Sequence, residues 1–377
     1  MINYEFPPIG GGGGNANFAI LKEFAGRKDL NIDLLTSASQ PGLFLEHFAD
    51  NIKIHKIGIH KKQLHYWRKT EVIEWLLKAG WYHKKLVRNY NYDLVHAFFG
   101  FPSGWLCLKT AKKIPYIISL RGSDVPGYNT RLKTEYKILS PVFARIWNNA
   151  AMVIANSQGL CELARKFTPD IDISVIPNGV DISRFKNKPA APNLKKVKLI
   201  TVCRLIDRKR IDLIIKAVRI LNDIGCNVEL DIAGDGVLKK SLYDLASKLG
   251  AVDKINFLGL IESDHISQVY KSNDIFVMAS RHEGMSNAML EAMASGLPII
   301  TTPCEGTKEL IDGNGIIVND PILDSIAQAV IKLASDQKLY QQMSSKSQSQ
   351  AGLFSWACTA NKYKDCYLKT ISEGAGI

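Results

Sequence analysis

The sequence predicts an α/β protein made of two doubly wound parallel-sheet domains, and three observations carry this prediction. The chain has 377 residues, which is too long for one ordinary core and suits two domains of roughly 100 to 200 residues each. Apolar runs of strand length alternate with helical patterns from one end to the other, as in βαβ units. Hydrophobic residues make up 46% of the chain and charged residues 22%, so each half can bury a core.

Strands are predicted wherever a short apolar run is bounded by turn residues. In the first half these runs are residues 32–36, 93–98, 115–120, 151–155 and 173–176. In the second half they are residues 197–202, 227–233, 254–259, 274–279 and 297–301. Helical patterns lie between the strands. The clearest is a stripe of apolar residues at helical spacing, made of Ile211, Ile214, Ile215, Val218 and Leu221.

Periodicity is lost between residues 181 and 196, where proline, asparagine and lysine accumulate, so we predict a linker there. The first domain is therefore expected to span residues 1–185 and the second residues 186–354. The helical segment 355–377 could belong to either domain, and we assign it to the first. A cleft is expected between the two domains.

The composition also narrows the cellular setting. No apolar run approaches the roughly 20 residues that span a bilayer, and the N-terminus lacks the basic and apolar regions of a signal peptide. We therefore expect a cytoplasmic protein. The seven cysteines are scattered without a C-x-x-C spacing, which favours reduced thiols and no metal cluster.

Five consecutive glycines, residues 10–14, follow the short opening segment of the chain. Gly11, Gly13 and Ala16 satisfy the G-x-G-x-x-A fingerprint of dinucleotide sites. The next strand, however, ends at Thr36 without the carboxylate that such a site needs to hold the ribose. A dinucleotide site is therefore the weakest of three interpretations.

The second interpretation of the glycine run is a flexible structural turn. The third, which we favour, is a loop whose unhindered N–H groups meet a phosphate or a polyhydroxylated ligand at a helix N-terminus. Asn15 or Asn17 would cap that helix.

The segment 280–302 carries a sharper signal. It follows a strand, turns at Glu283, begins a helix capped by Ser286 or Asn287, and places Glu291 eight residues after Glu283. In an open parallel sheet the carboxyl edge is where ligands bind, and a helix N-terminus directs N–H groups at them. A diphosphate suits these donors, and the two carboxylates suit the hydroxyls of sugar and ribose rings.

Two cations stand at matching positions. Arg204 lies at the end of a predicted strand and Lys209 at the start of the next helix. Their side chains can converge on a leaving phosphate without a metal ion. The structural alternatives are a surface pair of cations and a glutamate that caps a helix. Either explains a single residue, but the ordered set in one domain favours the functional interpretation.

The order of these motifs resembles that of the family 4 retaining glycosyltransferases, also described as glycosyl transferases group 1. That family has the GT-B fold, in which two Rossmann-like domains face a cleft. The resemblance covers nearly the whole chain and rests on EFPPIGGGGG, VIPNGVD, CRLIDRKR, IAGDG, FLG and the pair Glu283 and Glu291 followed by GLPIITTPCEGTKELI. Two glutamates eight residues apart are weak evidence alone, whereas the ordered series is specific.

The resemblance implies a role for each of these residues. Arg204 and Lys209 would grip the diphosphate of a nucleotide-sugar and, with Glu283, form the catalytic set. The donor-binding set would consist of Gly13, Gly14, Gly284, Met285, Ser286, Asn287 and Glu291. Within it, Glu291 would bind the ribose hydroxyls.

The resemblance also implies a reaction. A sugar would pass from a nucleoside diphosphate to a hydroxyl of a glycan or lipid-linked acceptor held by the N-terminal domain, in the synthesis of cell-envelope polysaccharide. The anomeric configuration would be retained, the leaving diphosphate would accept the proton, and no metal or other cofactor is expected. The alternatives are a nucleotide-sugar 2-epimerase on the same fold and a non-catalytic nucleotide-sugar-binding subunit.

The chain departs from the family pattern at several positions. Cys203 and Arg210 stand where many relatives have glycine. Arg121 stands where many relatives have a histidine facing the donor sugar, and it would suit a phosphate, an acidic sugar or an acidic acceptor. Asp124 either shares that sugar side or pairs with Arg121 in a structural turn. His96, at a strand end, either contacts the acceptor or is a satisfied core histidine.

The segment 53–88 is strongly basic. It holds ten Lys and Arg residues against two glutamates, a net charge of +8, and interleaves them with Trp67, Trp75, Trp81 and Tyr82. Such segments lie on anionic membrane surfaces, so we expect a peripheral position on the inner face of the membrane. The alternatives are a solvated helix whose tryptophans are core residues, and a nucleic-acid surface, for which no recognised binding fold is present.

Overall fold

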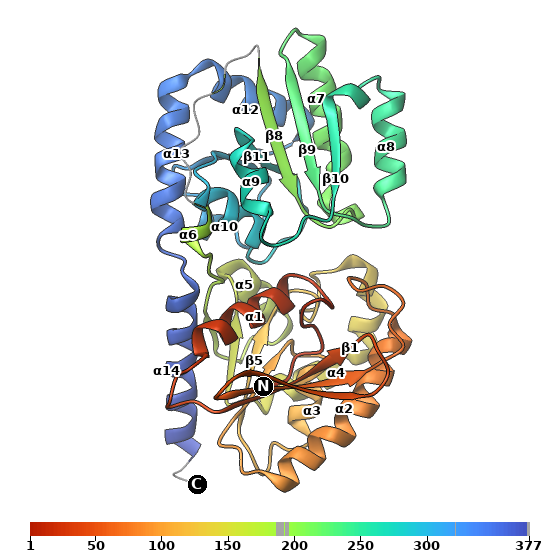
Figure 1. Cartoon of the computed structure of the whole chain (residues 1–377), viewed down its shortest axis with the longest axis vertical. Helices are drawn as coiled ribbons and strands as arrows, with labels where there is room; N and C mark the ends of the chain where they lie inside the picture. Colours follow the sequence, from red (N-terminus) through yellow and green to blue (C-terminus); the bar gives the residue numbers. More distant parts are fainter. Residues whose placement is uncertain (186–191, 193–195, 321, 375–377) are drawn as a thin grey trace. The chain divides into compact units, whose positions relative to one another are not determined.

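The computed structural model describes residues 1–185, 192, 196–320 and 322–374, so most of the predicted linker lies outside the described residues. The chain divides into two compact units, Met1–Asn178 with Trp356–Ile377, and Gly179–Ser355 (Figure 1). Each unit contains a parallel sheet covered by helices, which confirms the predicted α/β class.

Residues 179–185, which the sequence analysis assigned to the first domain, lie in the second unit. The short helix α6 (Ile182–Phe185) explains the difference. Its Phe185 is buried with Val180 in a core of the second unit, and the Phe185 ring lies 5.9 Å from that of Tyr270. Burial of these side chains in the second unit fixes the boundary between the two units. The segment is too short for its periodicity to reveal this burial.

The strands of the first unit pair in the orders β1-β3-β2 and β4-β5-β6-β7. Ile2 bridges both Leu35 and Ala97, so the N-terminal segment joins the two sets edge to edge. All of these strand pairs are parallel except β2 with β3. The bounds are β1 (Ile32–Ala38), β2 (Leu43–Ala49), β3 (Ile52–Gly58), β4 (Val95–Phe98), β5 (Tyr116–Leu120), β6 (Met152–Ala155) and β7 (Ile173–Val175).

The sequence analysis missed β2 and β3. β3 lies inside the segment that was taken as one basic stretch, because cations at Lys53 and Lys56 interrupt its apolar positions. Ile52 and Ile54 are nevertheless fully buried against the neighbouring elements. A strand can carry lysines on its exposed side and still bury its other side. Which side of β3 is buried becomes clear only from its pairing with the neighbouring strands.

Helices cover the sheet of the first unit. They are α1 (Gly12–Phe24), α2 (Lys69–Asn89), α3 (Ser103–Leu108), α4 (Lys133–Asn148), α5 (Gln158–Phe167) and α14 (Trp356–Gly374), with a 3-10 turn at Thr130–Leu132. The C-terminal helix α14 packs beside α1 (Figure 1), where the rings of Phe24 and Tyr367 lie 6.0 Å apart. Tyr363 and Tyr367 anchor α14 in the core of this unit.

The sheet of the second unit has the order β10-β9-β8-β11-β12-β13, with all strands parallel. The bounds are β8 (Val197–Val202), β9 (Val228–Ala233), β10 (Ile255–Gly259), β11 (Ile275–Met278), β12 (Ile299–Thr301) and β13 (Gly315–Ile317). The five predicted strands are present, and β13 was not predicted. The order reverses between β8 and β11, which is the arrangement of a Rossmann-type doubly wound sheet.

Two cores sandwich this sheet. Ile275 and Val277 of β11 face one core, and Phe276 and Met278 face the other. The predicted apolar stripe of α7 is buried in the first of these cores. The helices are α6, α7 (Ile211–Asp223), α8 (Lys239–Lys248), α9 (Ile266–Lys271), α10 (Asn287–Ala294), α11 (Thr307–Leu310), α12 (Ile322–Ser335) and α13 (Gln337–Ala351), with 3-10 turns at Asp207–Lys209 and Val252–Lys254.

Candidate functional site

The second unit brings two loops together where its strand order reverses. Arg204 and the turn Asp207–Lys209 follow β8, and the loop 279–286, which contains Glu283, follows the neighbouring strand β11. Loops that leave the carboxyl ends of two such strands form the crevice in which open α/β sheets bind ligands. The predicted cations and the first predicted carboxylate therefore meet at one edge of the sheet.

An ion pair joins the two loops. Lys209 Nζ donates to Glu283 Oε2, and the two side chains are only 8% and 18% exposed. Burial alone would raise the pKa of Glu283, but Lys209, Arg208 and Arg204 together hold this pKa below its ordinary value. Glu283 is therefore a carboxylate at neutral pH, with three basic side chains close to it.

α10 begins directly after this loop. Ser286 is its N-cap, and the Ser286 hydroxyl accepts a hydrogen bond of 3.3 Å from the Met289 N–H. Asn287, the other predicted cap, is the first helical residue, and Gly284 and Met285 are buried just before it. The positive end of the helix dipole thus lies beside the ion pair, where an anionic ligand is favoured.

Glu291 lies on the same helix. Its Oε2 lies 3.0 Å from the Tyr270 hydroxyl oxygen, which also lies 3.1 Å from the Ala288 carbonyl oxygen, so the one hydroxyl proton is shared between these two acceptors. Burial raises the pKa of Glu291 to about 7. Tyr270 escaped the sequence analysis because a tyrosine on a short helix carries no motif, and only the fold brings α9 against α10.

The backbone at Arg210 has a conformation that favours the glycine expected from the family pattern. It adopts the left-handed region with φ of 49°, between the turn Asp207–Lys209 and α7. This conformation is unfavourable by about 1–2 kcal/mol for a residue with a side chain, whereas glycine adopts it at almost no free-energy cost. Cys203, the other departure, has a thiol whose pKa is raised by burial, so it is a poor nucleophile.

The glycine run of the first unit is part of a helix. α1 begins at Gly12, inside the run, and Gly11 is its N-cap, so the prediction that Asn15 or Asn17 caps this helix was wrong. A Cβ atom on Gly13 would lie 2.4 Å from Cζ of Phe99.

The run is also tied to its neighbours. A Cβ on Gly14 would lie 3.2 Å from the Glu5 carbonyl, and Glu5 Oε2 accepts from the Gly11 N–H at 3.1 Å. The Gly10 N–H donates to the Leu64 carbonyl at 2.8 Å. The glycines therefore allow close packing of α1, and a role of Gly13 and Gly14 in donor binding stays a prediction.

His96 is the satisfied core histidine of the second alternative, and not a residue exposed to an acceptor. It is only 2% exposed. Its Nδ1 lies 2.8 Å from the Tyr367 hydroxyl and its Nε2 lies 2.7 Å from the Ser119 hydroxyl. Burial lowers its pKa well below the ordinary value, so the ring stays neutral.

Arg121 is held on three sides within the first unit. Its guanidinium donates to Asn178 Oδ1 at 2.7 Å and to the Tyr363 hydroxyl at 3.2 Å, and it lies 4.7 Å over the Phe98 ring. These contacts tie the end of β5 to α14 and to residue 178. They give Arg121 a structural role, and binding of an anionic ligand by it stays a prediction.

Asp124 has the structural role that the sequence analysis left open. It is buried, and its carboxylate accepts from the N–H groups of Gly100 at 2.7 Å and of Arg121 at 2.8 Å. Burial raises its pKa to about 6. Asp124 thus fixes the turn after β5 through backbone groups, which leaves its carboxylate occupied.

A cavity of about 430 Å³ opens in the first unit beside the start of the glycine run, at the carboxyl end of β1. Its lining includes Pro8, Ser39, Gln40, Phe44 and Glu46. This mixture of an aromatic ring with amide, hydroxyl and carboxylate groups suits a sugar or another amphiphilic ligand. The sequence analysis did not find it, since β2 supplies part of the wall.

The basic segment 53–88 is divided among β3, a loop and α2. Of the four aromatic side chains named in the sequence analysis, Trp75 and Tyr82 are buried, Trp67 is partly buried and Trp81 is 68% exposed. The alternative in which the tryptophans are core residues is thus correct for Trp75. None of the described helices is both long enough and apolar enough to cross a membrane.

Within the described ranges, no group of three or more His, Cys, Asp and Glu side chains is arranged to hold a metal ion. The seven cysteines are all free thiols.

Comparison with known families gives two matches that follow one another along the chain. A model described as Glycosyltransferase Family 4 matches residues 10–184, and one described as Glycosyl transferases group 1 matches residues 183–350. Among curated proteins, a Bacillus subtilis protein assigned provisionally to teichuronic acid biosynthesis, the glycosyltransferase TuaC, is 28% identical over 257 residues. That match covers 65% of this chain and 62% of the relative.

Solved structures with the same fold cover nearly the whole chain. Sucrose-phosphate synthase from Thermosynechococcus elongatus has a TM-score of 0.84 at 18% identity, over 99% of this chain and 98% of that one. HepE from Anabaena, solved with UDP and glucose, has a TM-score of 0.72 at 20% identity, over 98% of each chain. The likeness at this level of identity establishes the fold.

Proposed function

The chain belongs to the glycosyltransferases described as group 1 and family 4, and from that premise we propose that it transfers a sugar from a nucleoside diphosphate to a hydroxyl group, with retention of anomeric configuration. The observation that carries the proposal is the buried pair of Lys209 and Glu283 at the switch point of the second unit. This pair places a cation and a carboxylate side by side, as a phosphate and a sugar hydroxyl require.

In this proposal the diphosphate binds Arg204 and Lys209, with the start of α10 beside it. The three basic side chains that lower the pKa of Glu283 would offset the charge that develops on the leaving diphosphate. Glu283 would accept a hydrogen bond from a hydroxyl of the donor sugar, and Glu291 would accept from the ribose. These cations would neutralise charge on the diphosphate, as a bound metal ion does in other enzymes.

Retention without an enzymic nucleophile is part of the proposal. The leaving diphosphate departs from the face at which the acceptor hydroxyl arrives, and its oxygen takes the proton of that hydroxyl. The enzyme then needs no separate base. The core position of His96 agrees with this scheme and disfavours a 2-epimerase, which would need an acid and a base free to reach the sugar.

The acceptor would bind to the first unit, at the cavity beside the glycine run. Phe44 would stack on a sugar ring, while Gln40 and Glu46 would bind hydroxyls. The Bacillus subtilis relative named for teichuronic acid biosynthesis supports an acceptor that belongs to a cell-envelope polysaccharide.

The test of the proposed function is a panel of UDP-, GDP- and ADP-sugars. We expect one base to raise the melting temperature and its sugar to be hydrolysed slowly without acceptor, because water can replace the acceptor hydroxyl. The panel is read at about pH 6 and about pH 8, one unit either side of the Glu291 pKa of about 7. Ionised Glu291 is the better acceptor for ribose, so affinity should fall about tenfold or less as the pH falls.

A matched variant, Glu291→Gln, separates this effect from titration of the nucleotide itself. It should bind more weakly at the higher pH and lose the part of the pH dependence that Glu291 causes. If no nucleotide-sugar of the panel raises the melting temperature, the proposal that the second unit binds the donor is refuted. Stabilisation without hydrolysis or transfer would instead favour a non-catalytic binding subunit.

We further propose that the first unit rests on an anionic membrane surface through one face of α2. Ile73, Leu77 and Trp81 stand at intervals of four residues and are 56%, 71% and 68% exposed. Lys69 precedes this stripe by four residues and Lys85 follows it by four. We call these five residues the α2 face.

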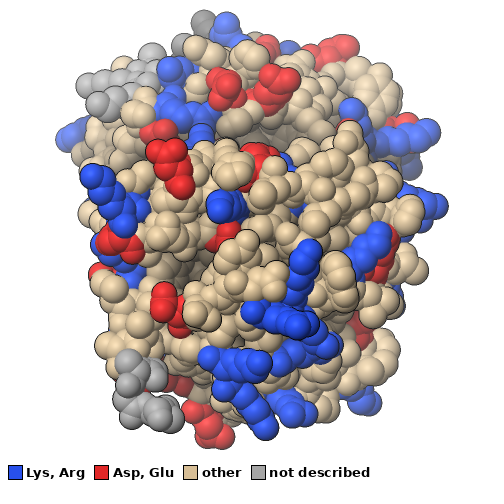
Figure 2. All heavy atoms as spheres, turned by 60° about the horizontal axis from the view of Figure 1, so that its bottom comes forward, with Lys and Arg blue, Asp and Glu red and all other residues tan. Residues whose placement is uncertain are grey.

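The charge around the α2 face supports this orientation. Lys84, Lys85 and Arg88 are exposed near the end of the helix, and Lys85 Nζ lies 5.9 Å from the Trp81 ring. Figure 2 turns the lower part of Figure 1, where α2 runs, toward the viewer and shows Lys and Arg side chains gathered there. Anionic headgroups attract such cations with about 1 kcal/mol each, while an aromatic ring enters the interface.

Liposome flotation tests this membrane proposal. The protein should float with vesicles of phosphatidylcholine and phosphatidylglycerol at low salt, and less so at high salt or with phosphatidylcholine alone. Leu77→Ser with Trp81→Ser should reduce flotation about tenfold or more, because about 1.5–3 kcal/mol of burial is lost per large side chain. Leu260→Ser, at an equally exposed leucine of the second unit, is the control. Absence of binding at low salt would remove the proposal.

A further inference from the structure

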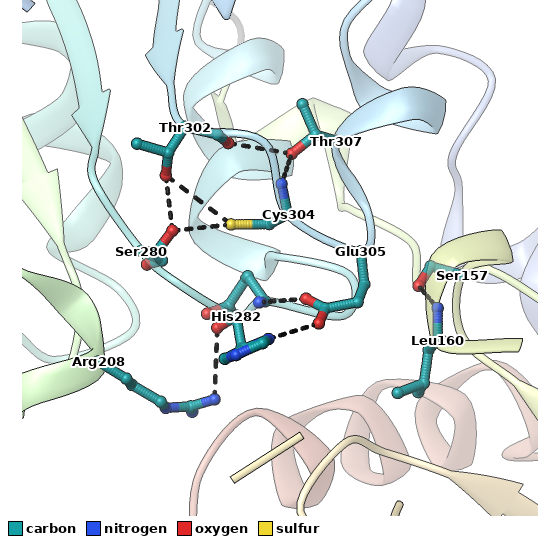
Figure 3. A network of polar contacts seen from close by, with 10 residues as sticks. Ser157, Leu160, Arg208, Ser280, His282, Thr302, Cys304, Glu305 and Thr307 are labelled. Atoms are coloured by element: carbon teal, nitrogen blue, oxygen red, sulfur yellow. Dashed lines mark hydrogen bonds and ion pairs between the residues drawn. The ribbon is translucent and has the colours of Figure 1, made fainter. Parts of the chain in front are cut away.

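The turn 303–307 lies against the loop that carries Glu283 (Figure 3). It follows β12 and leads into α11. It belongs to the segment GLPIITTPCEGTKELI that contributes to the family resemblance, but neither the resemblance nor the proposed chemistry gave any of its residues a role. Its Glu305 is nevertheless only 13% exposed and points at the loop after β11 (Figure 3).

Two consecutive residues of this turn hold the backbone of Glu283 from both ends. Glu305 Oε2 accepts a 2.9 Å hydrogen bond from the Glu283 N–H, and the Gly306 N–H donates to the Glu283 carbonyl at 3.0 Å. Both backbone polar groups of Glu283 are thereby fixed. The position of its side chain depends on this short segment.

The second oxygen of Glu305 is also used. Glu305 Oε1 lies 2.7 Å from Nδ1 of His282, which must donate because an ionised carboxylate only accepts. One side chain thus accepts two hydrogen bonds from adjacent residues. A carboxylate offers two equivalent acceptor oxygens for this purpose, whereas a glutamine offers one.

The two backbones touch at this point. A Cβ atom on Gly306 would lie 1.8 Å from the Gly284 carbonyl oxygen, so no other residue fits without moving the loop. Within the turn, Thr307 Oγ1 accepts from the Cys304 N–H at 2.9 Å. Cys304 Sγ lies 3.0 Å from the Ser280 carbonyl, which joins the turn to the loop after β11. Glu305 therefore projects from a rigid support.

The loop is held from the opposite side by the turn that carries Lys209. The Arg281 N–H donates to the Arg208 carbonyl at 2.8 Å, and Arg208 Nη1 lies 3.5 Å from the His282 carbonyl. Arg281 also pairs with Asp207 at 3.0 Å. Residues 281–283 therefore lie between the turn Asp207–Lys209 and the turn 303–307.

From this arrangement we infer that Glu305 is a positioning residue, which holds the Glu283 carboxylate at the place where the donor sugar is to bind. The inference rests on the proposed function for the identity of the ligand. Glu305 does not touch the reacting atoms in this account. It acts through the backbone of Glu283 and through His282.

The experiment compares Glu305→Ala and Glu305→Gln with the wild type and with Glu262→Ala, a glutamate whose side chain is 85% exposed in the same unit. Hydrogen exchange of the peptide 281–286 is measured by mass spectrometry. Loss of a hydrogen bond to a charged group should speed exchange there by about 10- to 100-fold in Glu305→Ala. Glu305→Gln should lie between, since one acceptor remains, and Glu262→Ala should match the wild type.

Kinetics with the donor that the wild type hydrolyses supply the second measurement. Glu305→Ala should lower kcat about tenfold or more, because even a displacement of about 1 Å in a catalytic group is costly. The Kd of the free nucleoside diphosphate, which lacks the sugar, should stay within about threefold of the wild type. Glu305→Gln should recover part of kcat.

The outcomes separate the two proposals. Unchanged exchange and unchanged kcat in Glu305→Ala would overturn the positioning role. Faster exchange throughout β8 to β10, with loss of nucleotide binding, would also overturn it, because Glu305 would then support the whole unit. If the wild type turns over no donor and exchange in 281–286 alone still rises, the proposed function fails while the positioning of Glu283 is upheld.

Discussion

Replacing Lys209 by alanine is expected to lower the rate of sugar transfer about 10²- to 10³-fold, as loss of one charge-stabilising group does in other enzymes. Lys209 is the most buried of the cations near Glu283 and is paired with it directly. Its removal deprives the leaving diphosphate of a fixed positive charge. The kcat of donor hydrolysis measures this loss without knowledge of the acceptor.

The same substitution leaves a buried carboxylate without its partner. Breaking a buried pair costs about 3–5 kcal/mol, so Lys209→Ala is also expected to lower the melting temperature. The double variant Lys209→Met with Glu283→Gln removes both charges and should recover stability without recovering turnover. Lys216→Ala, at a half-exposed lysine of α7, is the matched control for both measurements. Undiminished hydrolysis by Lys209→Ala would refute the phosphate clamp.

Gly13→Val is expected to impair transfer more than nucleotide binding. Its Cβ atom would fall 2.4 Å from Phe99 Cζ, and Phe99 is buried against Tyr4, with ring centroids 4.9 Å apart. The ring cannot move aside without disturbing this core. Overpacking of this kind costs about 1–3 kcal/mol or more, all of it in the first unit.

Transfer to an acceptor and the Kd of the nucleoside diphosphate should be measured together in this variant. The proposed phosphate-binding residues Arg204 and Lys209 lie in the second unit, so the Kd is expected to stay within about threefold while transfer falls at least tenfold. Gly12→Ala, at an exposed position of the same helical turn, should leave both unchanged. A Kd that rises in parallel with the loss of transfer would instead place Gly13 at the donor.

The candidate donor site was largely predictable because its residues lie in short local patterns. A strand followed by a cation-rich turn, and a strand followed by a glutamate, a cap and a helix, are each readable within about a dozen residues. Parallel strands then bring their carboxyl ends to one edge, so the meeting of Lys209 and Glu283 followed from the fold class.

The first unit was less predictable. The sequence analysis placed His96 at a strand end and Arg121 near the sugar, where ligand contacts are expected, yet their side chains contact Tyr367 and Tyr363, which lie far away in the sequence. A strand end can face a ligand or a covering helix with the same local pattern. For His96 and Arg121, the return of α14 to this unit decided between the two.

The sequence by itself determined the α/β class, most of the strands and the residues of the second unit that hold charge, because each depends on periodicity or on spacing within one βα element. The tertiary structure alone decided that the glycine run opens a packed helix, that β2 and β3 pair as a hairpin, and that Glu305 supports Glu283. Each of these features depends on hydrogen bonds or van der Waals contacts between residues that are far apart in the sequence. Such residues meet only when the whole chain packs around its cores, so no local pattern predicts them.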